Sequence, residues 1–132
     1  PALTQNKLVM SDRFVDSMIV YQGIVGGMAR NDIDAMNYIA CGDIYPDVTI
    51  ILDIDSQIGL ARAKSRSAGE DRFELKGLAY HEKVRAGFLY VAADDPLRCV
   101  VINANRTPDD IAEDIWQVVR PHLQACGLIG NG

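Results

Sequence analysis

Apolar residues along the chain fall into three short runs, at residues 8–10, 48–54 and 99–102. The second run is almost uniformly apolar and β-branched, which is typical of a strand covered on both faces of a sheet. We expect each run to form a buried strand. Because helix-like segments separate the runs, the pattern predicts an α/β domain with a parallel sheet.

Helices are predicted between and around these runs. Apolar residues recur at helical spacing over residues 14–25, 32–41, 56–66, 75–93 and 108–123. Gly42 is placed to end the second of these helices, and Asp55 or Ser56 to cap the third. Thr107 followed by Pro108 is a typical start for the last helix.

The composition is that of a soluble globular protein of one domain. The chain has 132 residues, and none of its apolar runs approaches the ~20 residues that span a bilayer, so we expect no membrane segment. The net charge of −5 argues against a nucleic-acid partner. Cys41, Cys99 and Cys126 are far apart and form no CxxC or Cys/His cluster, which predicts reduced thiols in a cytoplasmic protein and no metal site built on cysteine.

Polar side chains follow each predicted strand, which is where ligands bind in parallel sheets. These residues are Asp12 and Arg13 after the first run, Asp53 and Asp55 at the end of the second, and Asn103 and Asn105 after the third. The planar fork of Arg13 matches a phosphate or carboxylate, and Asp12 could orient it, hold a hydrated magnesium ion or accept a proton. From this dipeptide alone, a salt bridge at the mouth of a loop is the preferred interpretation.

A second group of polar residues lies on the helix predicted next. Ser17 and Tyr21 are four residues apart and share a helix face. Gln22 offers both a donor and an acceptor, which suits the edge of a pyrimidine base. A polar helix surface accounts for the same three residues.

Basic residues gather around the polar, glycine-containing segment 65–71, which we expect to be a flexible loop. Arg62, Lys64, Arg66 and Arg72 flank this segment. These cations could close over a polyphosphate and neutralise charge that develops during transfer. A solvated basic helix end, paired with neighbouring acidic residues, stays open as the alternative.

Taken together, these stretches resemble the thymidylate kinase family over nearly the whole chain, from residue 1 to about residue 123. The matching text is DRFVDSMIVYQG, PDVTIILDID, GLARAKSR, DRFE, HEKVRAGF and VINANRTPDDIAEDIW. The first motif is specific, and the others are strong as a series. The resemblance implies a P-loop kinase (nucleoside monophosphate kinase) fold and phosphorylation of dTMP to dTDP with ATP and Mg²⁺. It also implies a cytoplasmic enzyme of a family that commonly forms homodimers.

The resemblance implies roles on the dTMP side. Arg13 corresponds to the family's arginine on the dTMP phosphate, and Asp12 to the acidic neighbour that organises this arginine or magnesium. Ser17, Tyr21 and Gln22 correspond to positions around the thymine and deoxyribose. The tyrosine is associated with rejection of a ribose 2′-hydroxyl.

Other roles follow on the ATP side. Arg62, Arg66 and Arg72 correspond to the family's lid arginines, of which Arg66 and Arg72 would act in catalysis by stabilising the transferring phosphoryl group. Asn103 and Asn105 lie in a loop that resembles the family's adenine-side loop. The family usually has aspartate where this chain has Asn103.

One family motif is absent from the sequence. The P-loop pattern GxxxxGK[ST] occurs nowhere in it, and in the family this pattern lies upstream. We therefore expect residues 1–125 to be the C-terminal portion of a thymidylate kinase domain, with an incomplete sheet, a lid at about 62–74 and a frayed tail at 126–132. We also expect this chain to lack kinase activity by itself. Two alternatives stay open: another nucleoside or nucleoside monophosphate kinase, and a nucleotide-binding or interaction module without catalysis.

Overall fold

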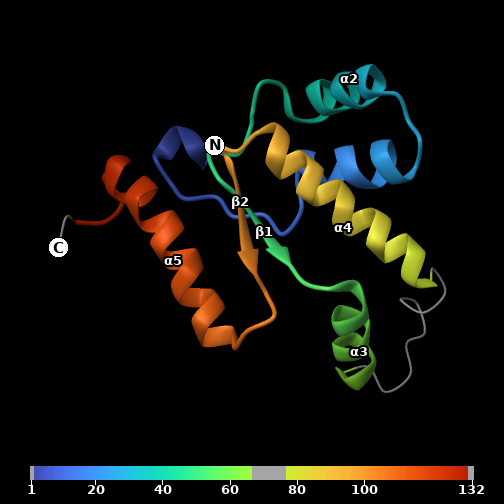
Figure 1. The fold of residues 1–132 in the computed structure, drawn as a ribbon. Coiled ribbons are helices and arrows are strands. Elements are labelled where there is room, and N and C mark those ends of the chain that lie inside the picture. Colours follow the sequence, from blue (N-terminus) through green and yellow to red (C-terminus); the bar gives the residue numbers. More distant parts are fainter. Residues whose placement is uncertain (1, 67–76, 131–132) are drawn as a thin grey trace.

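Two parallel strands, β1 (Thr49–Asp53) and β2 (Cys99–Asn103), form the centre of the molecule (Figure 1). They pair in register from Thr49 beside Cys99 to Asp53 beside Asn103. Both carboxyl ends therefore lie at the same edge of the sheet, as parallel pairing requires. The strands predicted near residues 48–54 and 99–102, and their parallel arrangement, are confirmed.

Helices precede, connect and follow the strands in this computed structural model, which describes residues 2–66 and 77–130. Their bounds are η1 (Leu3–Gln5), α1 (Val15–Met18), η2 (Ile19–Val25), α2 (Arg30–Cys41), α3 (Ser56–Arg66), α4 (Gly77–Asp94) and α5 (Pro108–Ala125). Figure 1 shows α5 on one side of the strand pair and α4 on the other, so the sheet is the middle layer. Among the described residues, no helix combines the length and apolar composition that a bilayer span requires.

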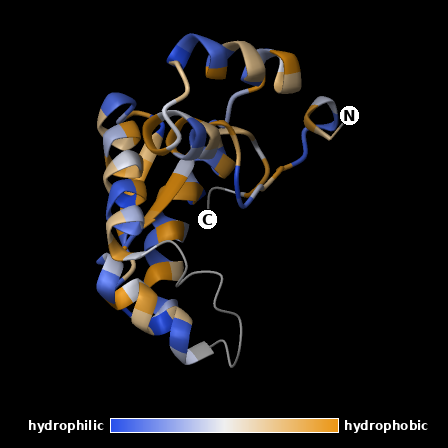
Figure 2. Ribbon diagram, turned by 90° about the vertical axis from the view of Figure 1, so that its right-hand side faces the viewer, coloured by the Kyte–Doolittle hydropathy of each residue, from blue (hydrophilic) through white to orange (hydrophobic). Residues whose placement is uncertain are grey.

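The hydrophobic core lies between the strands and α4, and η2 and α2 complete it. Its buried residues are Ile19, Val20, Ile33, Ile51, Val91, Ala92 and Cys99. Figure 2 shows strong hydrophobic colouring on the strands at the centre. Gly87 of α4 allows the close approach to η2, because a Cβ at this position would lie 2.9 Å from Cγ1 of Val20. Close packing of α4 on η2 therefore depends on the absence of a side chain at residue 87.

Two helix ends have the caps that the sequence predicts. Gly42 follows α2 with a φ of 62°, a conformation that glycine adopts without strain. The Thr107 hydroxyl accepts a hydrogen bond from the Asp110 N–H at 3.3 Å, and Pro108 is the first residue of α5. The helices α2 and α5 are thus confirmed, as are α3 and, within the described residues, α4.

The helix predicted over residues 14–25 divides into the α-helical α1 and the π-helical η2. Gly26 ends η2, and a Cβ on it would lie 2.6 Å from the Gln22 carbonyl oxygen. Glycine therefore permits the wide final turn. Because π-helical segments occur frequently at functional sites, it is notable that η2 contains both Tyr21 and Gln22.

Residues 8–10, predicted as a buried strand, are not a strand, and this expectation is wrong. They have no regular secondary structure, and Leu8, Val9 and Met10 are exposed, Met10 to 87%. A strand needs a partner for its N–H and C=O groups. Within residues 2–66 and 77–130 the sheet consists of β1 and β2 alone, and residues 8–10 pair with neither strand.

The expectation that the central strand is covered on both faces is also wrong. Ile51 faces the core and is 7% exposed, but Leu52, on the opposite face, is 51% exposed. The helix α5 packs against the neighbouring strand β2, whereas Leu52 of β1 stays half exposed. Of the loop predicted over 65–71, residues 65 and 66 form the end of α3 and the others lie outside the described residues.

A buried ion pair lies at the amino ends of the strands. Arg98, which precedes β2, donates to both carboxylate oxygens of Asp16 on α1 at 2.7 and 2.8 Å, and to Asp95 at 2.7 Å. The Thr49 hydroxyl, at the start of β1, donates to the same Asp16 carboxylate at 2.9 Å. Burial alone would raise the pKa of Asp16, but the hydrogen bonds from Arg98 and Thr49 and the charge of Arg98 hold it below its usual value. This cluster ties α1 to both strands.

Candidate functional site

The carboxyl ends of the strands bring together three of the residues predicted to bind the nucleotide donor. Arg62 of α3 donates through Nη1 to the Ala104 carbonyl oxygen at 2.8 Å and through Nη2 to Oδ1 of Asn105 at 2.9 Å. The Asn105 N–H in turn donates to Oδ1 of Asn103 at 2.8 Å. Residues far apart in sequence thus form one cluster, which we call the donor-side cluster: Arg62, Asn103 and Asn105.

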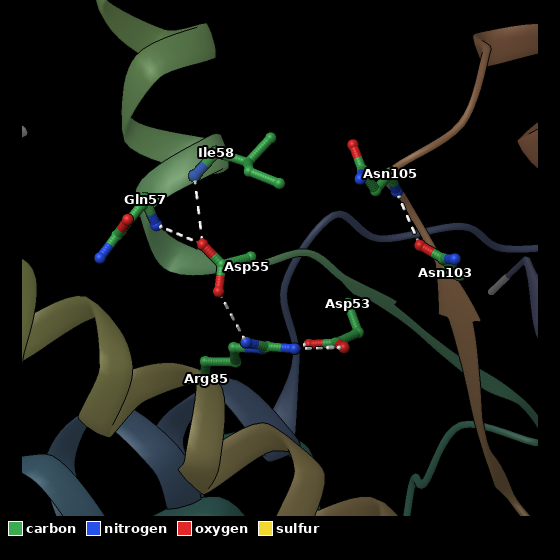
Figure 3. Close-up of polar contacts among 7 residues, drawn as sticks. All are labelled: Asp53, Asp55, Gln57, Ile58, Arg85, Asn103 and Asn105. Atoms are coloured by element: carbon green, nitrogen blue, oxygen red, sulfur yellow. Dashed lines mark hydrogen bonds and ion pairs between the residues drawn. The ribbon is translucent and has the colours of Figure 1, made fainter.

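A second cluster at this edge of the sheet joins three elements through one arginine (Figure 3). Arg85 of α4 donates through Nε and Nη2 to the two carboxylate oxygens of Asp53 at 2.7 and 2.9 Å. Its Nη1 lies 3.5 Å from Oδ2 of Asp55. The hydrogen bond from Arg85 lowers the pKa of Asp53, so this carboxyl stays ionised. We call Asp53, Asp55 and Arg85 the clamp.

Asp55 also begins α3. Its Oδ1 accepts hydrogen bonds from the N–H groups of Gln57 at 2.9 Å and Ile58 at 3.4 Å (Figure 3). Asp55, and not Ser56, is therefore the side chain that caps this helix. One carboxylate both caps α3 and contacts Arg85, so the start of α3 is tied to α4.

Two residues predicted to bind dTMP also lie together. The Arg13 guanidinium carbon lies 5.1 Å from the centroid of the Tyr21 ring, within cation–π range. Tyr21 in turn meets Phe88 of α4 edge to face, with 5.9 Å between ring centroids. We call Arg13, Tyr21 and Phe88 the acceptor-side cluster. It places an exposed guanidinium over a ring that α4 supports.

The structure also describes other residues that are predicted to bind dTMP or to act in catalysis. Asp12 and Gln22 are exposed, and Ser17 of α1 is half-buried. Arg66 is the last residue of α3. Arg72 lies outside the described residues.

A pocket of about 260 Å³ lies between β1, α3 and α4. Asp53 and Arg85 of the clamp line it, and so does Phe88 of the acceptor-side cluster. The pocket therefore extends from Asp53 and Arg85 at the end of β1 to Phe88 of α4. Its remaining lining is mainly apolar, from residues such as Ile54, Leu60 and Val84.

The clamp is the part of this region that the sequence pattern does not single out. Arg85 lies between Val84 and Phe88, which contribute to the apolar stripe of α4, and by itself it resembles an ordinary polar position on a helix. Asp53 and Asp55 were predicted to lie at a strand end, but no local signal pairs them with a residue on α4, which begins beyond the segment 67–76. The pairing is visible only in three dimensions.

Comparisons with known proteins agree on one family. The sequence model described as thymidylate kinase matches residues 1–115. The thymidylate kinase of Rhodopseudomonas palustris (strain ATCC BAA-98 / CGA009) is 44% identical over 125 residues, which cover 93% of this chain and 54% of that protein. The thymidylate kinase of Bradyrhizobium diazoefficiens is 45% identical over 125 residues, covering 93% of this chain and 55% of that protein. The chain therefore spans about half the length of the curated relatives it matches.

A solved structure gives the same result. The crystal structure of thymidylate kinase from Ehrlichia chaffeensis matches this fold with a TM-score of 0.65 at 30% sequence identity. The match covers 89% of this chain and 53% of that one. The predicted α/β P-loop kinase fold class is thereby confirmed.

Proposed function

The chain belongs to the thymidylate kinase family, and from this membership we propose that it serves the transfer of a phosphoryl group from ATP to dTMP, giving dTDP. The observation that supports the proposal is that residues predicted to bind ATP and residues predicted to bind dTMP form two separate clusters of contacts. Phosphoryl transfer requires little covalent chemistry from the protein and depends on positioning and charge neutralisation. Two separate clusters of this kind supply such positioning.

On the acceptor side, Arg13 would hold the phosphate of dTMP. Its guanidinium is exposed and lies over the Tyr21 ring, so its donors can reach a ligand while the ring limits its movement. Tyr21, Ser17 and Gln22 would contact the deoxyribose and thymine, as the family resemblance implies. The edge-to-face contact with Phe88 supports this role, because it limits the movement of the Tyr21 ring.

On the donor side, Arg62, Asn103 and Asn105 would contact the adenine end of ATP. The hydrogen bonds of Arg62 to the loop after β2 support this assignment, since they place three polar side chains together at the sheet edge. Arg66 and Arg72 would stabilise the transferring phosphoryl group, a role that rests on the resemblance alone.

The residues present fit a magnesium ion that arrives with ATP. Mg²⁺ keeps several waters and is commonly held by one or two carboxylates together with substrate phosphates. Asp12 is exposed beside Arg13 and offers one such carboxylate, whereas the Asp53 carboxylate is already bonded to Arg85. When bound, the ion would neutralise phosphate charge. Asp12 would hold it or orient Arg13.

The proposal extends to a homodimer in the cytoplasm, as the family resemblance implies. The outer face of α2 supports an association of this kind, because Tyr38 is 64% exposed and Ile39 is 84% exposed.

A chimeric enzyme tests the proposed activity. In the thymidylate kinase of Rhodopseudomonas palustris, the 125-residue segment that this chain matches would be replaced by the corresponding residues of this chain. We expect this chimera to release ADP from ATP in the presence of dTMP and Mg²⁺, measured by a coupled assay, and to prefer dTMP over UMP and dCMP. The unmodified Rhodopseudomonas palustris enzyme is the positive control.

The outcomes separate the alternatives. If the chimera is folded, as judged by circular dichroism, and prefers another nucleoside monophosphate, that nucleotide would replace dTMP as the proposed substrate. A folded chimera that binds nucleotides without dTMP-dependent ADP release would favour the non-catalytic module.

A further inference from the structure

Arg85 connects three elements at the carboxyl end of the sheet. From α4 it reaches the last residue of β1 through both carboxylate oxygens of Asp53, and the cap of α3 through Asp55. Its three guanidinium nitrogens are all directed at these carboxylates (Figure 3). A bidentate arginine–carboxylate pair has a defined geometry as well as a favourable energy. The clamp therefore fixes how α4, β1 and α3 meet.

The charge of the clamp argues against direct binding of a ligand. Two carboxylates face one guanidinium, so a phosphate entering here would meet an excess of negative charge. A cation would have to displace the guanidinium that both carboxylates already contact. The arrangement therefore suits a structural connection better than a binding site for a phosphate or for a cation.

This connection continues to the donor-side cluster by two routes. The first passes through α3, which Asp55 caps and from which Arg62 reaches the Ala104 carbonyl oxygen and Asn105. The second passes through the backbone, because the Asp53 carbonyl oxygen accepts a hydrogen bond from the Ala104 N–H at 2.7 Å. Both routes end at the same loop after β2. Loss of the Arg85 contacts would loosen both routes where they begin, at Asp55 and at Asp53.

We propose that Arg85 is a positioning residue for the phosphoryl donor, acting through Asp53, Asp55 and α3 to hold Arg62 against the loop that contains Asn103 and Asn105. It touches neither nucleotide itself. The inference rests on the proposed function, because it assigns the donor-side cluster to ATP. The acceptor-side cluster does not contain Arg85, so its binding of dTMP should not depend on the clamp.

A double-mutant cycle in the chimera tests this chain of contacts. Arg85→Met is expected to raise KM for ATP about tenfold, the low end of the effect of losing a charged hydrogen bond, and to change KM for dTMP less than about twofold. In an Arg62→Met background, Arg85→Met should add less than about twofold, because the two residues act in series. Additive effects of the two substitutions, or an equal rise in both KM values, would overturn the proposal.

Matched variants separate positioning from general destabilisation. Arg30→Met removes an exposed ion pair with Asp34 on α2, away from the clamp, and should leave KM for ATP unchanged. Arg85→Lys keeps the charge without the bidentate geometry, so it should fold and give a smaller rise in KM for ATP. If Arg85→Met fails to fold, the cycle is measured with Arg85→Lys.

Failure of the proposed function and failure of this inference are distinguishable. If the chimera binds ATP without dTMP-dependent turnover, the same cycle is measured on the Kd for ATP by calorimetry. If the effects of the Arg85 and Arg62 substitutions on the Kd for ATP are not additive, the positioning role of Arg85 is supported even though the proposed function fails. Additive changes in Kd would overturn the role of Arg85. A folded chimera that binds no ATP would overturn both.

Discussion

Replacing Arg98 with methionine is expected to lower the free energy of unfolding of the chimera by about 3–5 kcal/mol, which is typical when one partner of a buried ion pair is removed. The Asp16 side chain is only 6% exposed and the Arg98 side chain only 15%. Without Arg98, the Asp16 carboxylate would keep the Thr49 hydroxyl as its remaining side-chain donor and would lie in the interior without a countercharge. Urea unfolding followed by circular dichroism measures the loss.

Two control variants make this expectation specific to the buried pair. Combining Asp16→Leu with Arg98→Met removes both charges, and it should recover much of the stability because apolar replacement of a buried pair is often neutral. Arg30→Met removes an ion pair whose side chains are 54% and 45% exposed, so it should cost at most about 1 kcal/mol. A loss of less than about 1 kcal/mol in Arg98→Met would show that the ion pair contributes little.

The same pair predicts a dependence of stability on pH. The pKa of Asp16 in the folded chain lies below its ordinary value of 3.8 because of Arg98 and Thr49, despite the opposing effect of burial. Its contribution is therefore fully present above pH 3.8 and is lost as the pH falls through the lower folded pKa. The difference in unfolding free energy between the parent chimera and Asp16→Asn should be constant from neutral pH down to mildly acidic pH and shrink below it. A difference that does not change in acid would contradict this account.

Local patterns were sufficient to predict most of the secondary structure. The strand near residues 48–54 is recognisable from its β-branched residues, and α5 from Thr107 and Pro108 at its start. These signals lie within a few residues of each other, so no knowledge of the fold is needed. Residues 8–10 have the same apolar character, yet a strand also requires a neighbouring strand, which no local pattern reports.

Contacts between distant residues account for what the sequence did not reveal. Arg85 and Asp53 are separated by 32 positions, and Arg98 and Asp16 by 82. Arg85, Arg98 and Asp16 resemble ordinary surface charges when only their sequence neighbours are considered, and no local signal pairs Asp53 with Arg85. Parallel topology did indicate that side chains after β1 and β2 gather at one edge, and Asn103 and Asn105 do lie there beside Arg62. Their roles toward a nucleotide stay predictions.

Replacing Arg13 with alanine should lower kcat/KM for dTMP in the chimera about 10- to 100-fold, because a charged hydrogen bond to the acceptor phosphate is lost. The KM for ATP should change little, since Arg13 lies with Tyr21 in the acceptor-side cluster, whereas Arg62 lies at the loop after β2. Steady-state assays that vary each nucleotide separately measure the two effects. Arg62→Ala is the matched control, and it should show the reverse pattern, with a raised KM for ATP and an unchanged KM for dTMP. If Arg13→Ala leaves kcat/KM for dTMP unchanged, Arg13 does not hold the acceptor phosphate.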